Sequence, residues 1–174
     1  RTPHRATITD LTFRRKAWRE KITADIERDR PDIIGISCNT MYMQYVREVL
    51  GHIGTHCGLP IILGGYHASL KPEETLSLPG VEAILIGDGE YALAEYLDRR
   101  EAGGDPSDIP GVWTKRDGGI VRTAKGCFIK DIDDLPIPDW DLWEDLDLYF
   151  YFLGMLYIIG TRGCPYKCTY CDAH

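Results

Sequence analysis

The sequence lacks an apolar run long enough to cross a membrane as a helix. Its longest uncharged run, residues 148–161, is shorter than the roughly 18–20 residues that a spanning helix needs. We interpret this run as buried core or as a strand of a barrel. Residues 1–10 carry charges and no apolar stretch, so we expect neither a signal peptide nor a membrane span.

The sequence also lacks an excess of positive charge. Lys and Arg number 20 against 27 Asp and Glu, and the net charge is −7. Because proteins that grip a phosphate backbone show a basic face or stripe, nucleic acid is not an expected partner. Hydrophobic residues make up 44% of the 174 residues, which excludes a disordered chain and suffices for one buried core.

Cysteine is scarce and unevenly placed. The chain has six cysteines, and three of them lie within residues 164–171. Clustered thiols without a secretory leader indicate metal or redox chemistry in a reducing compartment rather than disulfides. We therefore expect a cytoplasmic protein.

Residues 1–104 alternate between strand and helix patterns. Apolar or alternating runs predict strands at residues 5–10, 32–38, 61–65 and 81–87. Amphipathic spacing predicts helices at residues 11–30, 41–56 and 90–102, and Pro72 marks the first turn of a short helix. Apolar strands separated by helices predict a doubly wound, mostly parallel α/β sheet of the Rossmann or flavodoxin type.

The pattern changes after residue 104. Residues 112–115 and 120–123 flank Arg116-Asp117-Gly118-Gly119, which predicts a β-hairpin. Residues 131–145 are rich in Asp, Pro and Trp and read as a solvated linker, and residues 156–160 read as a strand. We therefore divide the chain into an α/β domain at 1–104, a hairpin and linker at 105–150, and a cysteine-containing part at 151–174.

The cysteine cluster is the sharpest chemical feature. Cys164, Cys168 and Cys171 could hold three irons of a [4Fe–4S] cluster and leave the fourth iron open for a ligand. Alternatively, His174 could complete a structural Cys3His zinc site, or the loop could hold no metal. Spacing alone leaves these alternatives open.

Three loops follow the predicted parallel strands. Ligands of open α/β sheets bind beyond the carboxyl ends of the strands, where adjacent glycines allow close approach of the backbone. Alternatively, the glycines merely turn the chain, and the acidic residues merely start a helix. The candidate residues are Ser37, Thr40, Gly64, Gly65, Gly87, Asp88, Gly89 and Glu90.

Five motifs together resemble one protein family. The run GCPYKCTYC at residues 163–171 resembles the C-x3-C-x2-C signature of radical S-adenosylmethionine enzymes. Upstream, PDIIGIS (31–37), LGGYH (63–67), GDGE (87–90) and LPIPDW (135–140) resemble, in order, the landmarks of the cobalamin-binding members of that family. The resemblance covers nearly the whole chain.

The resemblance implies three cofactors: cobalamin, a [4Fe–4S] cluster and S-adenosylmethionine. Cys164, Cys168 and Cys171 would hold the cluster, whose open iron would chelate S-adenosylmethionine, and Tyr170 would lie near its adenine. Ser37 and Thr40 would donate hydrogen bonds to a corrinoid whose tail runs along Gly64 and Gly65. The same resemblance puts Tyr66, His67 and the loop from Gly87 to Glu90 at the cofactor, with His67 by the corrin edge or the domain interface rather than on cobalt.

The sequence departs from the family pattern in two respects. It has no Asp-x-His-x-x-Gly motif, whose histidine replaces the lower cobalt ligand in some cobalamin domains. Residues 6–10 resemble the second strand of the fold, so we expect the first strand and most of the barrel to lie outside this chain. The whole protein would then be an enzyme of methyl transfer, radical rearrangement or cyclisation, with an electron-donor protein and an unknown small substrate. The fragment alone would be inactive.

Two other functions remain open on the sequence alone. The chain could be a non-catalytic α/β module that binds cobalamin or another ligand. It could also be a zinc-stabilised interaction protein that uses Cys164, Cys168, Cys171 and His174.

Overall fold

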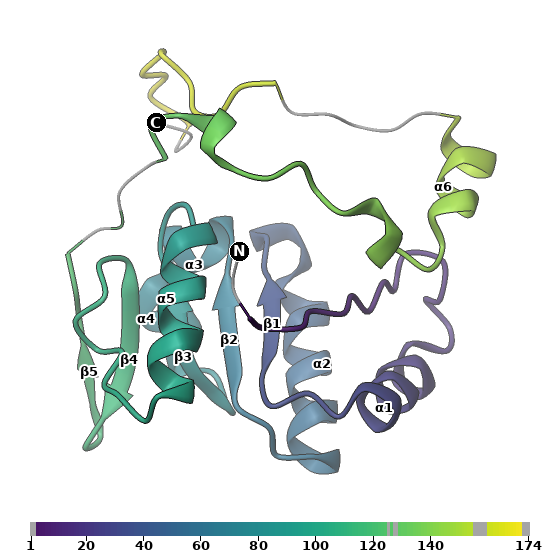
Figure 1. Ribbon diagram of the computed structural model, residues 1–174, viewed down its shortest axis with the longest axis horizontal. Helices are drawn as coiled ribbons and strands as arrows, with labels where there is room; N and C mark the ends of the chain where they lie inside the picture. The colour runs from purple at the N-terminus through teal and green to yellow at the C-terminus, as the bar shows by residue number, and fades with distance from the viewer. Residues whose placement is uncertain (1–2, 125, 127–128, 155–159, 172–174) are drawn as a thin grey trace. The chain divides into compact units, whose positions relative to one another are not determined.

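A computed structural model of the chain describes residues 3–124, 126, 129–154 and 160–171 (Figure 1). The chain divides into two compact units. Unit 1 comprises residues 1–5 and 23–129, and unit 2 comprises residues 6–22 and 130–174. Helix α1 (Trp18–Asp29) contributes to both units. Among the described residues, no helix is long and apolar enough to cross a membrane.

Unit 1 contains a five-stranded mixed sheet in which the strands follow their order in the sequence. The first three strands are parallel, so their carboxyl ends meet at one edge of the sheet, and the last two are antiparallel. The strands are β1 (Ile34–Ser37), β2 (Ile61–Gly64), β3 (Val81–Leu85), β4 (Val112–Arg116) and β5 (Gly119–Val121).

Helices cover both faces of this sheet, as the alternating pattern predicted. Helix α5 (Glu90–Glu101) packs through Tyr96 against Ile62 and Ala83 on one face. The other face is covered by α2 (Met43–His56), α3 (Tyr66–Leu70) and α4 (Pro72–Ser77) (Figure 1). The prediction of a doubly wound α/β fold is therefore confirmed.

Local sequence explains where the helices begin. Asn39 caps the 3-10 turn η1 (Thr40–Tyr42), because its side chain accepts a hydrogen bond from the Met41 backbone. Helix α2 follows directly and buries Met43, Val46, Leu50 and Ile53 at intervals of three and four residues. Helix α3 was not predicted, since five residues are too few to show a helical period.

The hairpin prediction is also confirmed, and the hairpin extends the sheet. Asp117 and Gly118 have φ angles of 51° and 77°, the conformation that a tight two-residue turn requires. Strand β4 pairs with β3, so the sheet continues past residue 104. The domain boundaries predicted from sequence remain a prediction.

Two elements predicted from sequence are wrong. Residues 5–10 are described and do not lie in a strand. Alternation predicts which side chains share a face, but a strand also needs a partner for its backbone groups. Residues 148–153 were predicted as buried core or barrel strand, yet they belong to helix α6 (Leu146–Leu153), where Tyr151 and Phe152 are exposed. The strand predicted at residues 156–160 lies outside the described residues except for Gly160.

Unit 2 joins two segments that are far apart in the sequence. The Tyr149 hydroxyl of α6 donates to Asp10 Oδ2 at 2.7 Å and lies 2.9 Å from Thr12 Oγ1. The Phe13 ring meets the Tyr149 ring edge-on, with centroids 4.9 Å apart. Two short 3-10 turns, η2 (Ile132–Asp134) and η3 (Trp140–Leu142), interrupt the acidic stretch that precedes α6.

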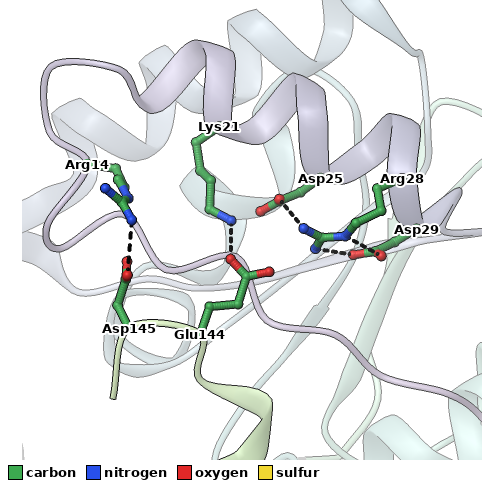
Figure 2. A network of polar contacts seen from close by, with 7 residues as sticks. All are labelled: Arg14, Lys21, Asp25, Arg28, Asp29, Glu144 and Asp145. Carbon is green, nitrogen blue, oxygen red and sulfur yellow. Dashed lines mark hydrogen bonds and ion pairs between the residues drawn. The ribbon is translucent and has the colours of Figure 1, made fainter. Parts of the chain in front are cut away.

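Part of that acidic stretch is paired rather than solvated alone. Lys21 Nζ lies 2.5 Å from Glu144 Oε2, and Arg14 Nη2 lies 3.1 Å from Asp145 Oδ1. Figure 2 shows both ion pairs. The partners of each pair lie more than a hundred residues apart in the sequence, so the composition of the acidic stretch predicted only a solvated linker. Each pair joins a partly buried side chain to one that is about half exposed, and ion pairs that reach solvent stabilise by only about 0–1 kcal/mol. The edge-on contact between Phe13 and Tyr149 stabilises unit 2 in addition.

Tyr96 carries a polar group into the core of unit 1. Its side chain is fully buried, and its hydroxyl donates to Glu82 Oε1 at 2.7 Å. Burial raises the pKa of Tyr96 above its usual value, and the hydrogen bond to Glu82 raises it further by a smaller amount. The folded chain therefore keeps Tyr96 protonated at a pH where the unfolded chain loses that proton.

Replacing Tyr96 with Phe tests this linkage. Because the unfolded state releases the proton first, Tyr96 makes the free energy of unfolding fall as pH rises above about 10. We expect Tyr96→Phe to lower that free energy by about 1 kcal/mol at pH 7. Between pH 9 and pH 11, the free energy of unfolding should decrease by about 1 kcal/mol less in the variant than in the parent chain. Urea unfolding at both pH values measures this difference, and exposed Tyr91→Phe is the control. Equal alkaline losses in parent and variant would contradict the assignment.

Candidate functional site

The carboxyl ends of β1 and β2 are joined by short hydrogen bonds. The Cys38 backbone N–H donates to the Gly64 carbonyl at 2.7 Å, and the His67 N–H donates to the Cys38 carbonyl at 3.1 Å. The Cys38 thiol is buried and also donates to the Gly64 carbonyl, at 3.0 Å. Burial raises the pKa of this thiol, which keeps it a neutral donor. We call this set of bonds the Cys38–Gly64 clasp.

Gly65 is the residue that allows the clasp to close. Its φ and ψ angles of 91° and −173° lie in a region that is essentially reserved for glycine. A Cβ there would lie 2.8 Å from the Cys38 carbonyl oxygen and 2.9 Å from Ser37 Oγ. Atoms of Ser37 and Cys38 thus fill the space beside Gly65, so the fold itself requires a residue without a Cβ at this position.

Next to the clasp, part of the sheet carries almost no side chains on the face against which α5 packs. We call this part, which consists of Gly35, Ser37 and Gly64, the bare strip. The register pairs Gly35 with Ile62 and Ser37 with Gly64, so Gly35, Ser37 and Gly64 share that face. Gly35 and Ser37 are exposed. Among the described residues, no atom lies within 4 Å of the position that a Cβ on Gly35 would take. Sequence reasoning missed Gly35, although a glycine inside a strand often marks close approach of another group.

Thr40 and His67 meet on the other side of the clasp. The exposed Thr40 Oγ1 lies 3.1 Å from Nδ1 of the buried His67 ring. His67 Nε2 lies 3.9 Å from Glu74 Oε1, and Arg47 pairs with the same oxygen at 2.8 Å. His67 Nε2 is buried and has no hydrogen-bond partner among the residues that the structure describes.

The third predicted loop, Gly87 to Glu90, lies at the same edge. The Gly87 N–H donates to Ser69 Oγ of α3 at 3.0 Å. Asp88 Oδ2 accepts the Ile129 N–H at 2.9 Å and so fixes the chain that returns after β5. Gly89 is the N-cap of α5, and Glu90 is its first residue. The loop therefore joins three segments in addition to starting a helix.

Large apolar side chains are exposed beside all three loops. Met41 is 83% exposed and Tyr66 is 68% exposed, and Tyr42 and Tyr91 are also exposed. Tyr66 was predicted as a site residue, whereas the other three were missed because helical spacing does not distinguish exposed from packed aromatics. We call Met41, Tyr42, Tyr66 and Tyr91 the aromatic rim.

One surface hollow lies away from this edge of the sheet. A hollow of about 840 Å³ is lined by Gly58, Pro60 and Gly80 at the amino ends of the strands. Since none of the predicted residues lies there, and since α/β sheets bind ligands at the opposite edge, we give it no role in the site.

The predicted cluster residues belong to unit 2, and the cobalamin candidates belong to unit 1. Cys164 and Cys168 are exposed, Cys171 is partly buried, and Tyr170 is 89% exposed. Within the described part of the chain, no three His, Cys, Asp or Glu side chains are arranged to hold a metal ion. The three thiols of Cys164, Cys168 and Cys171 are ligands of the kind that an iron–sulfur cluster needs, but in this structure they do not converge on one point. His174, the fourth ligand of the zinc alternative, lies outside the described residues.

Substituting Gly65 tests the clasp. We expect Gly65→Ala to lower the free energy of unfolding by about 2–4 kcal/mol, because the new Cβ combines backbone strain with overlap. Gly58→Ala is the matched control, since Gly58 also has a positive φ, of 59°, but open space around it. That control should cost about 1–2 kcal/mol. Urea unfolding compares them, and a Gly65→Ala cost no larger than that of Gly58→Ala would refute the close approach.

Comparison with known proteins identifies a family for this part of the chain. The family model described as the B12 binding domain matches residues 2–97, which contain the clasp, the bare strip and the aromatic rim. An uncharacterized methyltransferase of Pyrococcus horikoshii is 30% identical over 170 residues, which are 94% of this chain and 35% of that protein. The cobalamin-dependent radical SAM methyltransferase TokK of Streptomyces tokunonensis is 27% identical over 82% of this chain and 22% of its own length.

A solved structure has a similar fold. The radical S-adenosylmethionine methyltransferase TsrM from Kitasatospora setae, with cobalamin and a [4Fe-4S] cluster bound, is 25% identical and has a TM-score of 0.60. The similarity covers 71% of this chain and 24% of TsrM. The chain thus spans about a third or less of the length of these relatives. The predicted resemblance is confirmed: this chain belongs to the B12 binding domain family, and its relatives include cobalamin-dependent radical S-adenosylmethionine methyltransferases.

Proposed function

We propose that unit 1 binds cobalamin at the carboxyl edge of β1, β2 and β3. The observation that carries the proposal is the bare strip beside the clasp, where Gly35 and Gly64 carry no side chain and Ser37 offers a hydroxyl. The strip lies within the residues that match the B12 binding domain. A strand edge without side chains suits the close approach of a ligand's extended tail.

The groups around the strip fit the remainder of a corrinoid. Corrinoids combine a broad macrocycle, polar side arms and a nucleotide tail, so their site needs apolar area together with hydrogen-bonding groups. The aromatic rim offers the apolar area, and Ser37 and Thr40 offer hydroxyls. Gly87, Asp88, Gly89 and Glu90 would border the same ligand from the third loop, and Tyr66 and His67 from the second. When bound, cobalamin supplies a cobalt centre that can carry a methyl group.

Filling the bare strip tests this proposal. Gly35 has open space beside it and lies in a strand, so Gly35→Leu should leave the free energy of unfolding within about 1 kcal/mol of the parent. We expect the variant to bind cobalamin at least about tenfold more weakly, a loss of about 1.4 kcal/mol. Equilibrium dialysis with cobalamin measures the affinity. The control is Gly51→Leu, which adds the same side chain at an open position of α2. Unchanged affinity in Gly35→Leu would exclude the strip.

The whole protein to which such a domain belongs would be a cobalamin-dependent radical S-adenosylmethionine enzyme. Support comes from relatives named as methyltransferases of that class and from the cysteine spacing. Its reaction would be a methyl transfer, a radical rearrangement or a cyclisation on a small molecule, with an electron-donor protein as partner. Cleavage of S-adenosylmethionine by this chain under reducing, anaerobic conditions would show that the chain is more than a binding module.

The C-x3-C-x2-C loop would hold the [4Fe–4S] cluster of that enzyme. Its support is the spacing of Cys164, Cys168 and Cys171, which presents three thiolates from one exposed loop, with Tyr170 beside the last of them. Tyr170 would then face the adenine of S-adenosylmethionine.

Anaerobic reconstitution with iron and sulfide tests the cluster. We expect the chain to retain iron and sulfide in equal amounts with broad visible absorbance, and Cys168→Ala to lose about 90% of both. Cys57→Ala, which removes a thiol from the end of α2, is the control and should retain both. Tightly held zinc without iron, lost again in His174→Ala, would instead support the Cys3His alternative.

A further inference from the structure

The His67 ring is held on one side and left unpaired on the other. Nδ1 lies 3.1 Å from Thr40 Oγ1, while Nε2 is buried with no hydrogen-bond partner among the described residues. Nε2 lies 3.9 Å from Oε1 of the Glu74 carboxylate. Arg47 holds the same Glu74 oxygen at 2.8 Å and keeps it on that side of the ring.

This environment selects one tautomer of the neutral ring. A proton on Nδ1 would leave the Nε2 lone pair facing a carboxylate oxygen with no hydrogen between them. A proton on Nε2 instead places an N–H, with its partial positive charge, 3.9 Å from the Glu74 carboxylate oxygen, which is favourable because the atom is buried. Nδ1 is then an acceptor, and the contact at 3.1 Å requires the Thr40 hydroxyl to donate to it.

The direction of that hydrogen bond determines what Thr40 offers to a ligand. A hydroxyl has a single hydrogen, so a threonine that donates to His67 presents only oxygen lone pairs to a ligand. Thr40 itself is exposed at the carboxyl edge, beside Met41 and Tyr42 of the aromatic rim. This differs from the sequence-based expectation that Thr40 donates to the cofactor.

We infer that His67 is a positioning residue that makes Thr40 a hydrogen-bond acceptor, so that Thr40 binds a carboxamide N–H of the ligand. The inference rests on the proposed cobalamin site and assigns one contact within it. A corrinoid carries primary carboxamides at its periphery and a phosphodiester in its tail. A carboxamide can donate a hydrogen bond and a phosphodiester can only accept one, so Thr40 binds the carboxamide of a corrin side arm and not the phosphate.

Corrinoids with one carboxamide hydrolysed to a carboxylate test the contact. The carboxylate cannot donate, and it would face the Thr40 lone pairs. We expect the 174-residue chain to bind one such monoacid at least about tenfold more weakly than cobalamin. Thr40→Val, which keeps the shape of the side chain, should bind cobalamin about 2- to 12-fold more weakly. The affinities of this variant for that monoacid and for cobalamin should differ by less than about threefold.

The controls separate this inference from the proposed site. Thr55→Val removes a hydroxyl that donates to Gly51 and His52 carbonyls in α2, and it should keep the full discrimination. If Thr40→Val also keeps it, or if the parent chain binds every monoacid as tightly as cobalamin, the inference is overturned while the site stands. If the parent chain binds no cobalamin, the proposed function itself fails.

The tautomer gives a second readout that needs no ligand. In nitrogen-15 NMR of the unliganded chain, the His67 ring should carry its proton on Nε2, with the signals assigned by their loss in His67→Gln. A proton on Nδ1 would overturn the inference. His67→Asn, whose side-chain oxygen can accept from Thr40, should retain the discrimination between cobalamin and the monoacid, whereas His67→Leu should abolish it.

Discussion

The Cys38–Gly64 clasp is the contact on which the rest of the site depends. Three hydrogen bonds of 2.7–3.1 Å tie the end of β1 to the turn after β2. They form only because Gly65 has no Cβ and adopts a backbone conformation that other residues avoid. The clasp sets where α3 begins and therefore brings His67 to Thr40.

The clasp also separates two kinds of surface at one edge of the sheet. On the face covered by α5 lies the bare strip, which offers backbone and one hydroxyl to a ligand. On the opposite face lies the polar chain from Thr40 through His67 to Glu74 and Arg47. A ligand with both a narrow tail and polar side arms matches this combination better than a small, uniform ligand does.

The two units carry the two chemical signatures of the sequence. The residues matched by the B12 binding domain lie mostly in unit 1, except for residues 6–22, and the cysteine loop lies in unit 2. Unit 2 is held by contacts between segments more than a hundred residues apart, such as Tyr149 with Asp10 and Lys21 with Glu144. The chain covers about a third or less of the length of these relatives.

The resemblance of five motifs indicated the family. Local pattern by itself determined the parallel α/β order and the hairpin, because apolar periodicity and turn residues are short-range properties. It failed at residues 5–10 and 148–153, where strand or helix depends on partners outside the segment. Only the tertiary structure decided that Gly35 lies bare on the face that it shares with Ser37, that the chain around Gly65 leaves no space for a Cβ, and that Thr40 Oγ1 lies 3.1 Å from His67 Nδ1. Each of these depends on atoms that are distant in the sequence and meet only when β1, β2 and the helices pack together.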